Sequence, residues 1–335
     1  MTYSQAVLSG DRLALSRLLT QVENDAPEGR AALIELFSHT GKAHLIGVTG
    51  APGTGKSSLV NQLALHYRKK DNKRVAIVAV DPSSPFTGGA VLGDRVRMRD
   101  LSGDTGVFIR SMATRGSLGG LAQSTANMVQ VFDASGFDVI IIETVGAGQS
   151  EVDVARLAHT TLVVEAPGLG DDIQAIKAGI LEIADILVVN KADRPGVENT
   201  EKALKSMLEL AHPVERIFQH HGSTMRIAAP KQDSSSAPLW IPPIQRTVSI
   251  EGKGIVELAE AIARHLAYLT QSGNWAVRER ARLEVELDAL IREALVNDFH
   301  RDVPQKKYDA VLVKIIQRSL SPLEAMKMLM DGRRK

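Results

Sequence analysis

Residues 50–57 have the sequence Gly-Ala-Pro-Gly-Thr-Gly-Lys-Ser, which matches the pattern G-x-x-x-x-G-K-S. An apolar, strand-like run over 44–48 precedes them, and a helix-like run over 58–67 follows. Between a strand and a helix, such glycines let backbone N–H groups turn toward phosphate oxygens, and Lys56 adds a positive charge. The Ser57 hydroxyl can reach a Mg²⁺ ion, and the helix N-terminus favours an anion. The predicted phosphate-binding residues are Gly50, Gly53, Thr54, Gly55, Lys56, Ser57 and Ser58.

Length and composition limit the class of protein. A chain of 335 residues is long enough for one large nucleotide-binding domain with additional helices. The net charge of +1 gives no reason to expect nucleic acid or a membrane as partner. The absence of cysteine excludes disulfides and thiolate metal sites and suits a reducing cytoplasm. The charged N-terminus is unlike a signal peptide, and the longest apolar runs are too short to span a bilayer. We therefore expect a cytoplasmic protein.

Between residues 44 and 190, short β-branched runs alternate with helical stretches. The expected strands are Leu45–Thr49, Val75–Val80, Val139–Ile142, Thr161–Val164 and Ile186–Val189. The expected helices lie near 57–70, 121–135, 171–184 and 198–211. Uninterrupted apolar strands between helices indicate a parallel sheet buried on both faces. The predicted fold class is α/β, a P-loop NTPase with a mostly parallel sheet flanked by helices.

Helical segments extend this core at both ends. Residues 1–40 are predicted to be helical, and 220–243 irregular, before a strand from Ile244 to Ile250 and a helix near 254–270. Helices are expected over 275–299, 305–318 and 322–331. The first of these has an apolar stripe consisting of Leu283, Leu287, Leu290, Ile291, Ala294 and Leu295. Because the stripe follows a domain that is already complete, it favours dimerisation over an internal core. The predicted domains are a helical extension over 1–40, a P-loop nucleotide-binding domain over 41–272 and a dimerisation extension over 273–335.

A second motif, Asn190-Lys191-Ala192-Asp193, directly follows an apolar run. In open α/β sheets, ligands bind beyond the carboxyl ends of the strands. The Asp193 carboxylate can accept hydrogen bonds from N1–H and the exocyclic amine of guanine, whereas adenine has no donor at either position. The Lys191 stem can lie along the base. The predicted guanine-binding residues are Asn190, Lys191, Asp193 and, later in the chain, Ser249. The alternative is that Asn190 and Asp193 are solvated residues at a helix start and that Ser249 is a polar residue without contact to the base.

Acidic residues follow two more strand-like runs. Asp81 ends the run that begins at Val75, and Glu143 ends the run over 138–142. Asp94 lies further along a proline- and glycine-rich segment that begins after Asp81. Mg²⁺ takes oxygen ligands and usually keeps several waters, which these carboxylates could hold. The predicted metal-site residues are Ser57, Asp81, Asp94 and Glu143. The alternative is that Asp81 caps its loop and Asp94 pairs with a neighbouring arginine.

The sequence contains few candidates for catalytic residues. Gly146 can offer its N–H to the γ-phosphate, but Ala147 cannot orient water, which makes Gln149 the nearest candidate. The catalytic candidates are Lys56, Glu143 and Gln149. We expect intrinsic turnover on the order of 10⁻⁴ to 10⁻² s⁻¹, because no glutamine or arginine is clearly positioned. Candidates for an accelerating group are Arg95, Arg110 or a partner protein.

Two further glycine-containing segments, 110–120 and 167–172, are expected at the same edge of the sheet as the nucleotide. We interpret both as flexible loops that sense the nucleotide or contact a partner; the alternative is ordinary strand–helix connections. The pair His220-His221 lies in a proline- and serine-rich stretch without cysteine, so it is expected to be exposed and not a metal site.

Longer motifs follow the phosphate loop in order. They are Asp81-Pro82-Ser83-Ser84, Glu143-Thr144-Val145-Gly146-Ala147-Gly148-Gln149-Ser150-Glu151, Gly168-Leu169-Gly170-Asp171-Asp172-Ile173-Gln174-Ala175-Ile176-Lys177-Ala178-Gly179 and Asn190-Lys191-Ala192-Asp193. With these motifs the chain resembles the MeaB/ArgK family of P-loop GTPases. The match covers most of the chain and is densest over 44–192.

The resemblance implies a Mg²⁺-dependent GTPase chaperone for an adenosylcobalamin-dependent acyl-CoA mutase, such as methylmalonyl-CoA mutase. Such a chaperone gates cofactor loading and guards against inactivation. The resemblance also implies a homodimer with helical extensions. The family's metal-associated acidic residues correspond to Asp81, Asp94 and Glu143, its guanine aspartate to Asp193, and its partner-responsive loop to 167–177. At Val248-Ser249-Ile250 the chain departs from the family's common Ser-Ala.

Two other functions use similar sheet and loop features. A metallochaperone GTPase would deliver nickel or cobalt, but without cysteine only the histidine pair is left to propose as a ligand. A small-molecule or protein kinase, as the older ArgK label suggests, needs an acceptor pocket and a base. We find no residues in the sequence that predict either one.

Overall fold

A computed structural model of the chain describes residues 2–81, 98–101, 103–113, 120–144, 150–168, 183–211, 216–220, 223–227 and 239–331. By packing, the chain divides into a large unit up to Arg282 and a small unit from Leu283 onward. In the described residues, no helix is both long enough and apolar enough to cross a membrane. Asp94, Gly146, Gln149 and Arg95 lie outside the described residues, as do most of the expected helix over 171–184 and the loop after Gly168.

The large unit is built on a seven-stranded sheet, in the order β3-β2-β4-β1-β5-β6-β9, in which all pairs are parallel. The strands are β1 (His44–Thr49), β2 (Val75–Asp81), β3 (Val107–Ala113), β4 (Val139–Thr144), β5 (Thr160–Glu165), β6 (Ile186–Val189) and β9 (Ile244–Arg246). Because every residue of β1, β4, β5 and β6 is buried, the middle of each strand is an apolar run that does not alternate with polar residues. The predicted fold class is confirmed.

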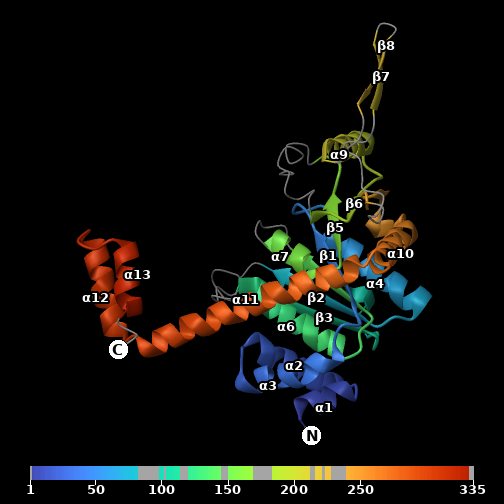
Figure 1. Cartoon of the computed structure of the whole chain (residues 1–335). Helices are drawn as coiled ribbons and strands as arrows, with labels where there is room; N and C mark the ends of the chain where they lie inside the picture. The colour runs from blue at the N-terminus through green and yellow to red at the C-terminus, as the bar shows by residue number, and fades with distance from the viewer. Residues whose placement is uncertain are drawn as a thin grey trace. The chain divides into compact units, whose positions relative to one another are not determined.

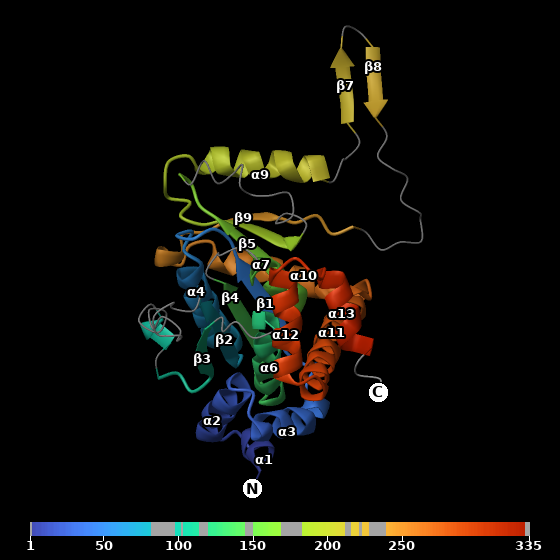
Figure 2. The same ribbon diagram turned by 90° about the vertical axis from the view of Figure 1, so that its left-hand side faces the viewer.

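Helices cover both faces of this sheet (Figures 1 and 2). On one face, α4 and α10 close a core over the central strands; on the other face, α6 and α7 cover the central strands and α9 packs on β6 and β9. The bounds are α4 (Lys56–Asp71), α6 (Gly120–Ala134), α7 (Ser150–Leu157), α9 (Val197–Ala211) and α10 (Ile255–Gln271). The short helices η2 (Arg99–Leu101) and η3 (Ser249–Glu251) both contact α4.

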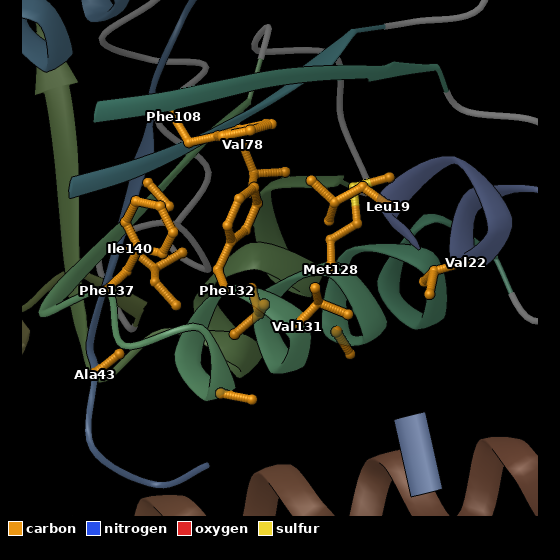
Figure 3. Close-up of a cluster of buried hydrophobic side chains, with 14 of the residues drawn as sticks. Leu19, Val22, Ala43, Val78, Phe108, Met128, Val131, Phe132, Phe137 and Ile140 are labelled. Atoms are coloured by element: carbon orange, nitrogen blue, oxygen red, sulfur yellow. The ribbon is translucent and has the colours of Figure 1, made fainter. Parts of the chain in front are cut away.

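The amino-terminal helices belong to the same unit. They are α1 (Tyr3–Leu8), α2 (Arg12–Glu23), α3 (Pro27–Leu36) and η1 (Phe37–His39), as the sequence predicts. Figure 3 shows Leu19 and Val22 of α2 gathered with Met128, Val131 and Phe132 of α6 and with Val78 and Ile140 of the sheet. The linker to β1 is held by Asp133, whose carboxylate accepts backbone N–H groups at 2.6 to 3.2 Å from 41–43.

The small unit consists of the later part of α11 (Asn274–Asp302) with α12 (Gln305–Ile316) and α13 (Pro322–Asp331). Helices α12 and α13 lie side by side (Figure 1), and Val303, Val311, Ala325 and Leu329 form their core. The stripe residues of α11 are exposed: Leu287 is 58% exposed and Leu295 56%. The expected helix over 275–299 is therefore present, and among the residues that the structure describes most of its apolar stripe is left exposed.

Four parts of the sequence prediction were wrong. The segment 110–120 was expected to be a flexible loop, but its first residues belong to β3, the edge strand. The segment 220–243 was expected to be irregular, but 223–227 form β8 (Ser223–Ile227), which pairs antiparallel with β7 (Arg216–His220). Helix α7 was not anticipated. The strand expected to reach Ile250 ends at Arg246, and η3 follows.

Candidate functional site

The phosphate loop lies between β1 and α4, at the centre of the sheet's carboxyl edge. Gly50 has a φ of +138°, and a Cβ there would lie 2.1 Å from the carbonyl oxygen of Val164 in β5. At Gly55, with a φ of +92°, a Cβ would lie 2.5 Å from Asn190 Nδ2. Both glycines are therefore required by close approach as well as by backbone conformation. Gly53 is the third left-handed glycine of the loop, with a φ of +81°.

Lys56 and Thr54 of the phosphate loop are held by hydrogen bonds to backbone carbonyls of the same loop. Lys56 is only 5% exposed, and its Nζ donates to the carbonyl oxygens of Gly50 at 2.7 Å and Ala51 at 2.9 Å. The Thr54 hydroxyl is buried and donates to the Ala51 carbonyl. Ser57 and Ser58 follow in the first turn of α4. The lysine charge is thus concentrated over the loop, where phosphate oxygens would be received.

Two of the predicted metal-site residues meet directly. The Ser57 hydroxyl donates to Glu143 Oε1 at 2.6 Å, and Glu143, in β4, is 5% exposed. Asp81 is the last residue of β2, the strand next to β4 on the sheet. The donor set that these residues offer is all oxygen, which fits Mg²⁺ with several waters and not a soft metal. Within the described ranges no three His, Asp or Glu side chains form a metal cluster of their own.

Asn190 joins the phosphate loop to the predicted guanine segment. Its Nδ2 donates to the Thr54 carbonyl at 2.8 Å. Its Oδ1 accepts from the Ser249 hydroxyl at 2.8 Å and from the Thr247 hydroxyl at 3.0 Å. All of these side chains are buried. Asn190 therefore fixes the distance between the loop and the segment 247–249, a role that its position after β6 alone did not reveal.

The next three residues of the motif become progressively more exposed, from the partly buried Lys191 and Ala192 to the exposed Asp193. Lys191 has a φ of +56°, unusual for a residue with a Cβ, and its Nζ donates to the Gly53 carbonyl at 2.5 Å. The neighbouring N–H of Ala192 donates to the Thr247 carbonyl at 3.0 Å. Asp193 follows in the turn and is exposed, as a base-binding carboxylate has to be. Thr247 was not anticipated as part of this site, since nothing in the sequence distinguishes it from other threonines.

The structure overturns one candidate for an accelerating group. Arg110 lies in the middle of β3, paired with Val78 in register, and not at the carboxyl edge. Its guanidinium forms an ion pair with Glu23 of α2, and both side chains are only 16% exposed. Arg110 thus attaches the N-terminal helices to the edge strand, and it is not available to the nucleotide.

Comparison with known proteins agrees with this geometry. The family model described as "Methylmalonyl Co-A mutase-associated GTPase MeaB" matches residues 15–303. The chain belongs to the MeaB family of GTPases. A putative GTPase of Pyrococcus abyssi is 41% identical over 321 residues, covering 96% of this chain and 93% of that protein. GTPase ArgK of Escherichia coli is 33% identical and covers 96% and 93%, respectively.

The fold of this MeaB-family chain is also found among solved structures. The crystal structure of a LAO/AO transport system kinase superposes with a TM-score of 0.68 at 26% identity, covering 99% of this chain and 97% of that one. The expected resemblance to the MeaB/ArgK family is therefore confirmed, and the chain is a P-loop GTPase.

The close approach at Gly50 gives a first prediction. Replacing Gly50 with alanine places a Cβ against the main chain of β5, so we expect the free energy of unfolding to fall by at least ~3 kcal/mol. Thermal and urea unfolding measure this. Gly41→Ala is the matched control, since Gly41 also has a positive φ, +88°, but no atom lies within 4 Å of its would-be Cβ. Its expected cost is only ~1–2 kcal/mol. Equal losses in the two variants would contradict the steric argument.

Proposed function

We propose that this GTPase binds GTP with Mg²⁺ and uses the nucleotide state to gate cofactor loading of an adenosylcobalamin-dependent acyl-CoA mutase of the methylmalonyl-CoA mutase type. The observation that carries the nucleotide part is the Asn190 amide, which ties the phosphate loop to the segment 247–249. Asp193 selects guanine beside it. A movement of the phosphate loop on exchange of GTP for GDP would therefore be transmitted to the base-binding segment through the Asn190 side chain.

The arrangement at Ser57 and Glu143 supports the role of the metal. When bound, Mg²⁺ supplies positive charge between the phosphates and lowers the cost of charge build-up during hydrolysis. Ser57 Oγ would hold the ion directly, and the Glu143 carboxylate, 2.6 Å from that hydroxyl, would hold a water of the ion. Asp81 and Asp94 complete the proposed set. Gly146 and Gln149 follow Glu143 in sequence and are proposed to contact the γ-phosphate and the attacking water.

The partner is supported by the name of the matching family model, which links that family to methylmalonyl-CoA mutase. The test is a binding titration of the full-length chain against a purified methylmalonyl-CoA mutase, with a non-hydrolysable GTP analogue and with GDP. We expect affinities that differ by about 5- to 150-fold between the two nucleotides, which corresponds to ~1–3 kcal/mol of coupling. Equal affinity for both nucleotide forms, or no binding to the mutase, contradicts the proposal.

We also propose that residues 273–335 make the chain a homodimer. The support is the exposed stripe on α11 and an apolar groove of about 330 Å³ in the small unit, whose lining includes Phe299, Tyr308 and Met326. Exposed apolar surface of this kind marks an interaction site. Sedimentation analysis should give a dimer, and Leu287→Glu together with Leu295→Glu should give a folded monomer. A wild-type chain that stays monomeric at micromolar concentration contradicts this assignment.

A further inference from the structure

A second buried polar cluster lies at the opposite end of the strands from the phosphate loop. It consists of His44 at the start of β1, His159 and Thr160 at the start of β5, Asp185 just before β6, and His265 of α10. Exposure of these five side chains ranges from 0 to 8%. We call it the amino-edge cluster. Neither the nucleotide site nor the sequence motifs use any of its residues.

The first two turns of α11 dock onto this cluster. Arg278 donates to both carboxylate oxygens of Asp185, at 2.6 and 2.8 Å, and to the carbonyl of His159 at 2.7 Å. Glu279 Oε1 lies 2.6 Å from His159 Nε2. The Trp275 ring lies 3.8 Å, centroid to centroid, from the ring of His159. His159 therefore makes contact with the start of α11 through its ring face, its Nε2 and its backbone carbonyl.

The partners of His159 require a neutral ring. The backbone N–H of Leu45 in β1 donates to His159 Nδ1 at 3.1 Å, so Nδ1 has to be unprotonated. The single ring proton then sits on Nε2 and is donated to Glu279. A second proton on Nδ1 would point at the Leu45 N–H, so the ring would have to leave this position. Trp275 and Glu279 both contact the imidazole ring of His159, and both would lose these contacts if the ring moved.

His265 differs in this respect. Its Nδ1 lies 2.9 Å from Thr160 Oγ1, and the same hydroxyl lies 2.8 Å from His44 Nε2. Its Nε2 lies 3.2 Å from Asp185 Oδ1. The neighbours of the His265 ring are thus a hydroxyl, which can donate or accept, and an anionic carboxylate. The ring nitrogen that accepts from a backbone N–H is Nδ1 of His159.

The charged groups around His159 shift its pKa in opposite directions. Burial lowers the pKa of His159 below its usual value, and the Arg282 and Arg278 charges of α11 lower it further. The Glu279 carboxylate, also on α11, raises it, and the net shift of the His159 pKa is downward. His44 of β1 lies 6.2 Å away, ring to ring, and the pKa of His44 is lowered to about 3 by burial and by His159 and His265. Asp185 and His265 are the remaining titratable groups of the cluster.

We propose that His159 is a proton-sensitive latch for the start of α11, closed when the ring is neutral and released when the ring is protonated. Since the folded state binds the proton more weakly than an exposed histidine does, the latch is fully closed above pH 6.5 and weakens as pH falls below it. The opening equilibrium should rise as pH falls below 6.5, by at most about tenfold for each pH unit. Because α11 continues beyond Leu283, the latch holds the base of the helix that leads to the small unit.

Fluorescence can test the latch, because the only two tryptophans of the chain are Trp240 and Trp275. In full-length Trp240→Phe protein, Trp275 emission should change with a midpoint below pH 6.5 while far-UV circular dichroism stays constant. His159→Gln should remove this transition. His66→Gln, the same change on α4, should retain it. Emission that changes only together with the loss of helix, or a transition that persists in His159→Gln, overturns the proposal.

Hydrogen exchange on the wild-type chain gives a second test that needs no variant. After correction for intrinsic rates, amides of residues 275–282 should lose protection by up to about fivefold between pH 6.5 and pH 5.5. Amides of α10 should keep theirs over the same range. A uniform loss in both helices, or no loss in either, overturns the latch.

Discussion

Replacing Lys56 with alanine should weaken GTP binding by about 10²- to 10³-fold. The side chain is 5% exposed, and its Nζ lies over the loop, donating to the carbonyls of Gly50 and Ala51. A phosphate entering the loop gains a charge-assisted hydrogen bond from this group, and such bonds contribute about 1.5–3 kcal/mol each. Because the ammonium can serve two phosphate oxygens, the expected loss is ~3–4 kcal/mol, and each 1.4 kcal/mol is a factor of ten. Titration with a fluorescent GTP analogue measures it.

The control for this prediction is a lysine on the same helix. Lys69→Ala removes an equal charge from the exposed last turns of α4, and it should leave GTP affinity unchanged. Lys56→Ala also removes two hydrogen bonds of the loop, so the melting temperature of both variants should be compared without nucleotide. If Lys56→Ala binds GTP within threefold of the wild type, the assigned role of the loop is wrong.

The central strands could be predicted because their environment leaves a simple trace in the sequence. A strand buried on both faces is an unbroken apolar run, and 139–142 and 186–189 are such runs. The phosphate loop follows β1, Glu143 lies near the end of β4, and Asn190 follows β6. Because these strands are parallel, the three lie at the same edge of the sheet, as the sequence predicts. Fold and site are thus linked by the topology of a parallel sheet.

The edge strand could not be predicted in the same way. In β3 the apolar run is interrupted by Arg110, whose charge is compensated by Glu23, 87 residues earlier in the chain. Burial of an arginine depends on a partner that sequence spacing does not reveal. Similarly, β9 ends early because Thr247 and Ser249 turn back to reach Asn190. These two assignments were therefore wrong because long-range polar contacts outweigh local propensity there.

The amino-edge cluster has no sequence signature either. Its three histidines are 115 and 106 residues apart, and each is unremarkable in its local context. His44 and His159 lie at the amino ends of β1 and β5, which the parallel sheet aligns, and His265 joins them from within α10 through Thr160. One edge of the sheet thus collects the residues for the nucleotide, and the other collects the residues that hold α11.

Replacing Asp193 with asparagine should change the base preference of the site. In the proposed site the Asp193 carboxylate would accept hydrogen bonds from N1–H and from the exocyclic amine of guanine; in asparagine, an NH₂ group would face that amine, donor against donor. We expect GTP affinity to fall by about 10²- to 10³-fold, in the range that a mispaired polar group causes in such sites. Xanthine has a carbonyl oxygen in place of the amine, so the same NH₂ group can donate to it. XTP affinity should therefore rise as GTP affinity falls.

Competition of GTP, XTP and ATP against a fluorescent nucleotide measures all three affinities in one experiment. Asp288→Asn is the control, because it makes the same change at an exposed position of α11, far along the chain from the motif. Opposite changes in GTP and XTP affinity distinguish between two explanations of weak GTP binding. A misfolded turn after Lys191, whose left-handed backbone is held by the Asn190 and Thr247 contacts, would weaken binding of every nucleotide. Only loss of a specific base contact weakens GTP and strengthens XTP, so a parallel loss for both would mean that Asp193 does not contact the base.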